Sequence, residues 1–473
     1  MALRIFNTFT RRKEDFVPLM SGEARMYVCG VTVYDLCHIG HARSAIVFDV
    51  MRRYLRFRNY KVTFIKNYTD VDDRIIRRAN EEGVPASTIS ERYIAEYQKD
   101  MASIGVEPAD VEPKATEHIP QMIVLIERLI ARGVAYVLDG DVYFEVRRFP
   151  AYGKLSGKNL DELEAGARVD VDERKRDPLD FALWKAAKPG EPSWPSPWGP
   201  GRPGWHIECS AMAMQYLGES FDFHGGGEDL IFPHHENEIA QAEGATGKPF
   251  VRCWSHNGFV NLDSEKMSKS LGNTLWIRDM VRRHEPEALR LYFLGTHYRH
   301  PLEYADERIV ESAKALGRLR ALVEEAERIA RGGPPPPGTG DAALLDQVDA
   351  HVARFIAVMD DDFNTPQALA VLFDLLRALY AGREQGAGAG AFVAGVGKLV
   401  ELARVLGLLE QAARPSAAID PQLKARVESL IYLREQARKQ RDFAEADRLR
   451  SELAALNVTL KDSRDGTTWT ISQ

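Results

Sequence analysis

Two imidazoles flank a glycine in the tetrapeptide His38-Ile39-Gly40-His41, and this spacing suits the binding of phosphate. The tetrapeptide opens a long run of apolar residues at helical spacing, and backbone N–H groups at a helix start attract phosphate. Gly40 lets a base or ribose approach the backbone closely, and the imidazoles can donate hydrogen bonds without burying a fixed charge. An ordinary buried strand–helix turn would also explain these four residues, so the motif alone is a hypothesis.

A second motif, Lys266-Met267-Ser268-Lys269-Ser270, places two lysines on a predicted loop between Leu262 and Leu271. Lysine ammonium groups can hold a departing pyrophosphate, and Gly272 with the small serines lets such a loop close and reopen. Two lysines in a short string more often form a solvated basic loop. The full string after Asn257-Gly258-Phe259-Val260 favours the pyrophosphate interpretation.

Two thiols, an imidazole and a carboxylate form a candidate metal site: Cys29, Cys209, His234 and Glu238. The imidazole and the carboxylate are one turn apart on a predicted helix face, and this donor set suits Zn²⁺. The four residues are scattered rather than arranged as Cys-x-x-Cys. Two buried cysteines and a surface His–Glu pair are therefore the alternative.

A strand–helix–strand unit is predicted to position the first motif. A β-prone run at residues 26–28 breaks at Gly30, the helix opens at the tetrapeptide, and a β-branched run follows from Val62 to Tyr68. In open α/β sheets the loop after the first strand faces the crevice at the carboxyl ends of the strands, where ligands bind.

A second α/β half is predicted to resume at Trp205. In it Gly225-Gly226-Gly227 predicts a strand-to-loop break, and a helix is expected from about His234 to Glu243 after Pro233. Between the two halves, residues 134–146 predict a hairpin with an Asp-Gly turn, whereas the composition of residues 188–204 argues against regular structure.

The chain is mostly helical from Pro286 onward and ends in a basic helix pair, residues 421–456, and a short β-like tail. At 473 residues, about two to four domains are expected. The net charge of −7 means that any RNA contact must come from local basic surface. No apolar run is long enough for a membrane span or a signal peptide, and the four cysteines lack disulfide spacing, so we expect a cytoplasmic protein.

Both motifs and their surroundings resemble a known family. Class I aminoacyl-tRNA synthetases carry the first motif followed at long range by the second, and the cysteinyl-tRNA synthetases among them carry further blocks that this chain matches over nearly its whole length. The matching blocks are CGVTVYDLCHIGHAR, GRPGWHIECSAM, FPHHENEIAQ, EKMSKSLGN and DDFNTP.

The resemblance implies an α/β Rossmann-type nucleotide-binding fold with an inserted connective subdomain, followed by an α-helical bundle and a small C-terminal anticodon-binding domain. The implied boundaries are 1–116 and 205–262 for the two Rossmann halves, 117–204 for the insertion, 263–310 for the lysine loop and junction, 311–412 for the bundle and 413–473 for the C-terminal domain.

It also implies a cysteine–tRNA ligase, which activates L-cysteine with ATP, releases pyrophosphate and transfers cysteine to the 3′ end of tRNA(Cys). The implied catalytic residues are His38, His41, Lys266 and Lys269; the ATP contacts are His38, Gly40, His41, Asp229 and Lys269; the contacts to substrate cysteine are Gly30, Thr69 and Trp205; and the zinc ligands are Cys29, Cys209, His234 and Glu238. One Zn²⁺ per chain, Mg²⁺ with ATP, tRNA contacts on helices 421–456 and a monomer are expected.

Zinc would meet a physical need, because serine differs from cysteine by one atom and shape separates such near-isosteres weakly. The metal strongly prefers a thiolate to an alcohol. Four protein ligands normally close a zinc site, so either the ion becomes five-coordinate or Glu238 loosens. The sequence leaves both possibilities open.

Two alternatives share parts of this pattern. The cysteine ligase of mycothiol biosynthesis activates cysteine in the same way but lacks an anticodon module, whereas this chain has basic helices after Pro421. A non-catalytic, zinc-stabilised RNA-binding relative would not need the lysines that handle pyrophosphate.

Overall fold

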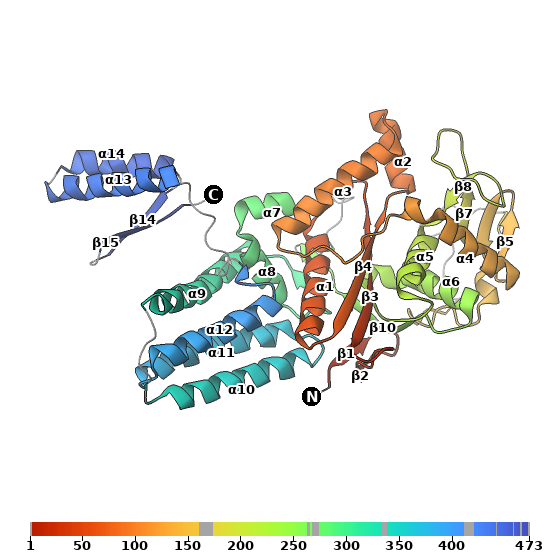
Figure 1. Ribbon diagram of the computed structural model, residues 1–473. Helices are drawn as coiled ribbons and strands as arrows, with labels where there is room; N and C mark the ends of the chain where they lie inside the picture. The colour runs from red at the N-terminus through yellow and green to blue at the C-terminus, as the bar shows by residue number, and fades with distance from the viewer. Residues whose placement is uncertain are drawn as a thin grey trace. The chain divides into compact units, whose positions relative to one another are not determined.

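The structure is a computed structural model, and it describes residues 2–159, 174–262, 265–266, 274–332, 338–410, 421–440, 442–456, 458–463 and 466–471. The chain divides into two compact units, Met1–Leu409 and Glu410–Gln473. Figure 1 labels the elements of both units. Among the described residues, no helix is both long and apolar enough to cross a membrane.

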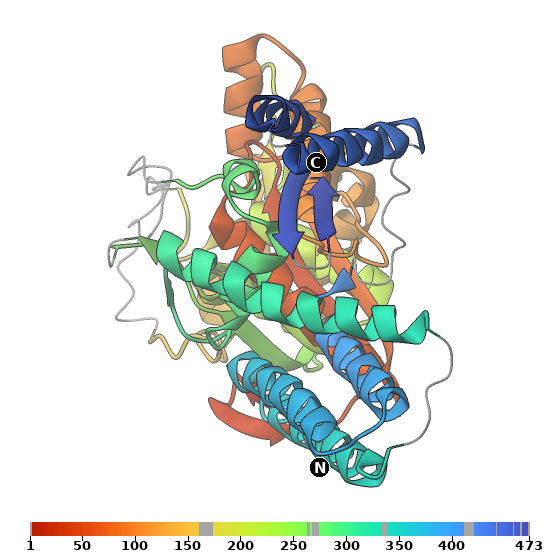
Figure 2. The same cartoon turned by 90° about the vertical axis from the view of Figure 1, so that its left-hand side faces the viewer.

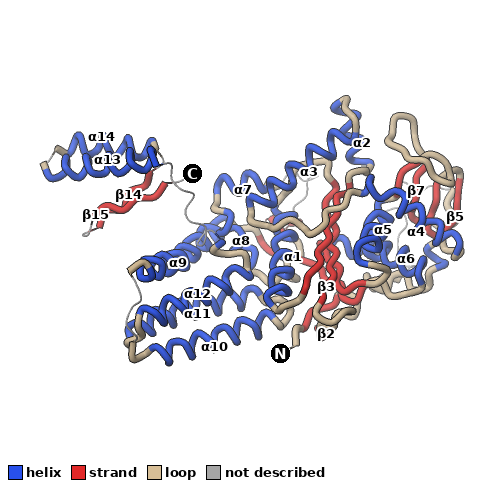
Figure 3. The backbone as a smooth tube through the Cα atoms, in the orientation of Figure 1, coloured by secondary structure: helices blue, strands red, loops and turns tan. Residues whose placement is uncertain are grey.

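A four-stranded parallel sheet with the order β10-β9-β3-β4 forms the centre of the first unit. Its strands are β3 (Glu23–Thr32), β4 (Lys61–Thr69), β9 (Phe221–Gly227) and β10 (Val251–Asn257). Helix α1 (Ile39–Phe57) connects β3 to β4 and covers one face, while α5 (Trp205–Leu217) and α6 (Glu236–Thr246) lie on the other (Figures 1 and 3). Because both faces are covered, most side chains of these strands are buried, the polar ones at their carboxyl ends included. The predicted strand–helix–strand unit is thus present.

An inserted subdomain lies between the two halves of the sheet. It contains α4 (Ile119–Ala131) and an antiparallel sheet with the order β5-β6-β7-β8, formed by β5 (Ala135–Leu138), β6 (Asp141–Phe144), β7 (Phe181–Ala186) and β8 (Gly201–Pro203). The predicted hairpin is β5–β6, with Asp139 and Gly140 at positive φ in its turn. The absence of regular structure predicted for 188–204 is wrong at β8. This strand is at the sheet edge, where proline is tolerated.

Two other local predictions are also wrong. Gly225, Gly226 and Gly227 belong to β9 rather than to a loop, and a Cβ on Gly225 would lie 2.3 Å from the Phe48 ring of α1. Glycine here permits close packing of strand and helix rather than a turn. His234 lies in the turn Ile231–His235 that precedes α6, so this helix begins at Glu236.

Helices α2 (Asp73–Glu82) and α3 (Ala86–Ser103) follow β4, and the remainder of the first unit is mainly helical. Figure 2 shows α9 lying across the view above α10, α11 and α12. The helices of this part are α7 (Ile277–Arg283), α8 (Pro286–Leu294), α9 (Asp306–Ala330), α10 (Asp341–Met359), α11 (Thr365–Glu384) and α12 (Ala389–Val405). Two small sheets comprise β1 (Arg4–Asn7) with β2 (Arg12–Asp15), and β11 (Val260–Leu262) with β12 (Glu265–Lys266) and β13 (Leu302–Glu303).

The second unit consists of the predicted helix pair, α13 (Pro421–Lys439) and α14 (Phe443–Ala455), and a hairpin of β14 (Val458–Ser463) and β15 (Gly466–Ile471). It has its own small apolar core, formed by Val427, Leu430, Ile431, Leu449, Leu453 and Val458. The unit therefore has a hydrophobic core of its own.

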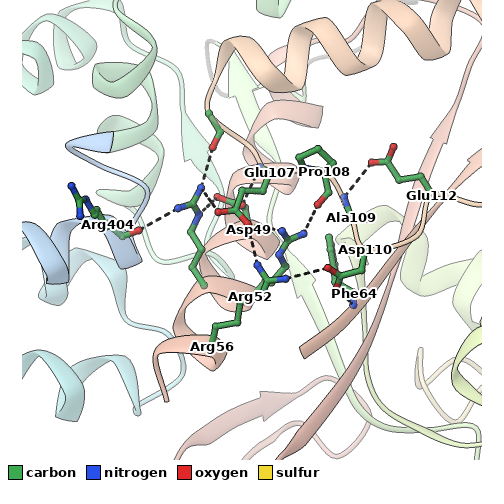
Figure 4. Close-up of polar contacts among 12 residues, drawn as sticks. Asp49, Arg52, Arg56, Phe64, Glu107, Pro108, Ala109, Asp110, Glu112 and Arg404 are labelled. Atoms are coloured by element: carbon green, nitrogen blue, oxygen red, sulfur yellow. Dashed lines mark hydrogen bonds and ion pairs between the residues drawn. The ribbon is translucent and has the colours of Figure 1, made fainter. Parts of the chain in front are cut away.

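Ion pairs and hydrogen bonds fix α1 on its outer face. The Asp49 carboxylate, 2% exposed, pairs with Arg53 at 2.9 Å and with the buried Arg290 of α8. Arg290 also donates to the carbonyl oxygens of Leu406 at 2.7 Å and Gly105 at 3.2 Å. Burial raises the pKa of Asp49, but the two guanidinium groups outweigh it and hold this pKa below its usual value. Figure 4 shows the neighbouring contacts of α1 with Glu107, Pro108 and Asp110.

The hydroxyl of Tyr54 joins α1 to the end of α10. It lies 2.7 Å from the buried Asp360 carboxylate, to which it donates. Tyr54→Phe should lower the free energy of unfolding by about 2 kcal/mol, because the carboxylate loses a buried hydrogen bond. The measurement is chemical unfolding, with Tyr60→Phe as the control, since the Tyr60 hydroxyl bonds to none of the described residues. Equal stability of the two variants would contradict this account.

Candidate active site

The histidine pair caps its own helix. His38 precedes α1, and its Nδ1 accepts a hydrogen bond from the Gly40 N–H at 3.1 Å. His41 Nδ1 accepts in return from the His38 N–H at 3.2 Å, and the rings stack with centroids 3.8 Å apart. A neutral imidazole has one N–H, so each ring whose Nδ1 accepts carries its proton on Nε2. Both Nε2–H groups therefore lie at a helix N-terminus, where the helix dipole favours an anion.

The four predicted metal ligands converge at the carboxyl end of the sheet. Cys29 comes from β3, Cys209 from α5, His234 from the turn before α6 and Glu238 from the first turn of α6. Their donor atoms all lie within 4.8 Å of one another. All four side chains are almost completely buried, so the scattered positions in the sequence form a single site.

The spacing of these donor atoms suits a tetrahedral metal. The two sulfurs are 3.7 Å apart, and Glu238 Oε1 lies 3.3 Å from Cys29 Sγ and 3.1 Å from His234 Nε2. Zn–S bonds of about 2.3 Å in a tetrahedron would place two sulfurs about 3.8 Å apart, and Zn–N and Zn–O bonds would place those ligands about 3.3 Å apart. The residues present therefore fit Zn²⁺ without rearrangement.

A second set of possible ligands overlaps the first and consists of Cys29, His224, His235 and Glu238. In it, His224 Nε2 lies 2.9 Å from Glu238 Oε2, the oxygen turned away from the first set, and His235 Nε2 lies 3.3 Å from Cys29 Sγ. These contacts are those of outer hydrogen-bond donors that orient metal ligands. Of the two sets, the one with two thiols therefore suits a zinc ion better, with His224 and His235 contacting its ligands from outside.

Electrostatics also favour a cation at this position. The hydrogen bond from Cys29 lowers the pKa of Cys209 to about 6, against the effect of burial. Burial raises the pKa of Glu238, but His224 and His234 hold it well below its usual range. Burial lowers the pKa of His234, yet Glu238 and Cys209 raise it overall to about 10. Without metal the cluster contains a thiolate and a carboxylate held by one imidazolium, and a divalent cation can displace the remaining protons.

Two histidines outside the ligand set have lowered pKa values, because burial is not outweighed by nearby negative charge. It lowers the pKa of His235 well below its usual range and that of His256 to about 3. Both rings are therefore neutral at physiological pH, and each holds a single N–H.

The three residues predicted to contact substrate cysteine surround this cluster. Trp205, at the start of α5, is 36% exposed and stacks on the His234 ring with centroids 4.4 Å apart. The Gly30 N–H donates to Asn67 Oδ1 at 2.9 Å, and a Cβ on Gly30 would lie 1.5 Å from the Asn67 carbonyl oxygen. Thr69 ends β4, and its hydroxyl accepts from Asn67 Nδ2 at 3.4 Å. Only glycine fits at position 30.

The structure describes two further residues predicted to contact ATP or pyrophosphate, Asp229 and Lys266. Asp229 is exposed in the turn Glu228–Leu230 after β9. Lys266 belongs to β12, where its backbone pairs with Asn261. Lys269 lies outside the described residues, so its role stays a prediction.

Sequence reasoning missed several polar residues around the metal ligands: Asn67, His206, His224, His235 and His256. His206 Nδ1 lies 2.9 Å from His234 Nδ1, and Asn67 Oδ1 lies 3.7 Å from Cys209 Sγ. His256 occurs near the carboxyl end of a parallel strand, and this position was the available signal, whereas His224 lies in the middle of its strand.

Comparisons with known proteins agree with this site. The model for the class I (C) tRNA synthetase catalytic domain matches residues 15–314, the DALR domain matches 354–410 and the cysteinyl-tRNA ligase anticodon binding domain matches 420–469. A methionyl-tRNA synthetase of Mycobacterium tuberculosis in complex with methionyl-adenylate has a TM-score of 0.59 at 19% identity, over 89% of this chain and 96% of its own. Fold and site define this chain as a class I aminoacyl-tRNA synthetase.

Sequence relatives give the particular family. A protein named cysteine–tRNA ligase from Geobacter sulfurreducens is 53% identical over 481 residues, covering 100% of both chains. One from Symbiobacterium thermophilum is 52% identical over 473 residues, covering 99% of both. The chain belongs to the cysteine–tRNA ligase family. A match to an anticodon binding domain disfavours the mycothiol-type alternative.

Proposed function

We propose that this protein activates L-cysteine with ATP and transfers it to the 3′ end of tRNA(Cys), and that a zinc ion bound by Cys29, Cys209, His234 and Glu238 selects the substrate by its thiolate. The observation that carries the proposal is the convergence of four donors at tetrahedral spacing beside the histidine-capped start of α1. The ion supplies a strong preference for sulfur over oxygen when bound.

The protein's own groups position the other reactants. The Nε2–H groups of His38 and His41 donate to phosphate oxygens of ATP, and Lys266 and Lys269 hold the departing pyrophosphate with Mg²⁺. Trp205 and Gly30 form the walls around the amino acid, where the flat indole and the bare backbone leave room for a small substrate. The two reacting groups are thereby held together, which lowers the entropic part of the barrier.

A tRNA substrate would engage both units. Helices α13 and α14 carry exposed Arg426 and Arg448, and Tyr432 and Phe443 are 60% and 64% exposed. Aromatic rings and arginines at the surface suit stacking with unpaired anticodon bases.

Exchange of pyrophosphate into ATP, measured with each amino acid in turn, tests the proposal. Cysteine should support exchange with a kcat/KM at least about 10⁴-fold above that of serine, because serine leaves the ligand position for sulfur unfilled. Charging of tRNA(Cys) should follow the same preference. Equal exchange with serine would refute recognition by the metal, and exchange with another amino acid alone would refute the activity.

A further inference from the structure

A chain of three side chains leads from the N-terminal segment to the metal ligand Cys29. Thr8 Oγ1 lies 2.8 Å from His256 Nδ1, His256 Nε2 lies 2.8 Å from His235 Nδ1, and His235 Nε2 lies 3.3 Å from Cys29 Sγ. His235 is fully buried and His256 is 5% exposed. These residues come from three separate elements, and the proposed chemistry does not use them.

The direction of this chain is fixed by its two ends. A metal-bound Cys29 is a thiolate, which only accepts hydrogen bonds, so His235 must donate from Nε2. With Nε2 as the donor, the tautomer that needs no extra proton has His235 Nδ1 accepting from His256 Nε2 at 2.8 Å. The same reasoning makes His256 Nδ1 an acceptor, and the donor to it is the Thr8 hydroxyl. One tautomer at each ring satisfies all three contacts.

The N-terminal segment is held so that Thr8 can serve this purpose. The Thr8 N–H donates to the Trp254 carbonyl of β10 at 2.8 Å, and Asn7 accepts from the Trp254 N–H at 3.1 Å. Asn7 Nδ2 also donates to the Arg252 carbonyl at 2.9 Å. The segment is thus docked along β10 by both of its polar residues, and this docking places the hydroxyl at the end of the histidine pair.

We propose that Thr8, His256 and His235 are positioning residues that keep one N–H directed at the Cys29 sulfur, an inference that rests on the proposed metal site. A hydrogen bond to a metal-bound thiolate withdraws charge from the sulfur, so the ion attracts a further thiolate more strongly. The chain therefore tunes the metal for the thiol of the substrate. Its terminal residue touches neither metal nor substrate.

Thr8→Val tests the chain with a substitution of nearly equal shape. Without the hydroxyl, His256 Nδ1 loses its partner, and the two rings hold the His235 N–H on the sulfur less firmly. In the cobalt-loaded protein the sulfur-to-cobalt absorption band should move to longer wavelength, because the thiolate is more electron-rich. The affinity of the zinc-loaded protein for cysteine, measured by equilibrium binding, should fall about tenfold. In the zinc-loaded protein, ¹⁵N spectra of labelled histidines should show altered tautomers at positions 235 and 256.

Thr8→Ser keeps the hydroxyl and should match the wild type in all three measurements, while Thr10→Val, on the same exposed turn, should change none of them. A Thr8→Val protein with the spectrum, affinity and tautomers of the wild type would overturn the chain. A rise in cysteine affinity would overturn it as well. If the wild-type protein binds neither zinc nor cobalt, the proposed metal site itself fails, and this outcome is separate from failure of the chain.

Discussion

The Cys209→Ser variant is expected to lose most of its zinc and at least about a thousandfold of its cysteine-dependent pyrophosphate exchange. A serine hydroxyl is not deprotonated near neutral pH and is a poor zinc ligand, so one vertex of the tetrahedron is lost. The loss also removes the anionic partner 3.7 Å from Cys29 and with it the charge that stabilises bound metal. Bound zinc and exchange rates are measured on the same preparation.

Cys253→Ser is the matched control for this variant. Cys253 is also a buried thiol on a strand of the same sheet, but it lies outside both possible ligand sets. It should retain zinc and exchange activity unless the fold fails. Equal behaviour of the two variants would mean that Cys209 acts through packing alone, and the metal would then have to be assigned elsewhere.

A protein truncated after Leu409 should retain cysteine-dependent exchange and lose efficient charging of tRNA. All donors of the site belong to the first compact unit, which ends at this residue. Attachment of tRNA at two places raises its effective affinity by about 10²–10⁴, so removing one should raise the KM for tRNA within that range. Charging by the full-length protein should also weaken more steeply with salt, because the removed cations contact phosphates.

Exchange and charging must be compared on a truncated protein whose thermal unfolding shows that it is folded. Parallel loss of both activities would mean that residues after Leu409 support the fold of the catalytic unit. Undiminished charging would mean that the anticodon is not bound there. Either result would contradict the division of labour between the two units.

The sequence predicted best those elements whose ends are marked by turn residues such as glycine and aspartate. Asp139-Gly140 marked the β5–β6 turn, because this conformation needs particular residues. The predicted break at Gly30 is wrong, because Gly30 lies inside β3, which continues to Thr32. The ligand set followed from chemical type together with family resemblance. In each case the information lies within a few residues or in a matching motif.

The remaining features depend on tertiary packing between distant parts of the chain, which the sequence does not show. The three glycines of β9 resemble a loop in sequence, but Phe48 fills the space that a side chain at Gly225 would need. The outer histidines are scattered through the chain, and only strand order brings His256 of β10 to His235. Thr8 had no local signal at all, because its partner is 248 residues away.

The three-way contact of Arg290 has a mechanical consequence. One guanidinium joins Asp49 of α1, the Gly105 loop and Leu406 at the end of the bundle, so these parts cannot slide past one another without exposing a buried charge. Helix α1 is about 28 Å long, and the fixed point lies in its middle. A helix that is fixed at its midpoint can tilt about that point but cannot translate. Movement of His38 and His41 around bound ATP is therefore limited to a small tilt of α1 about this point.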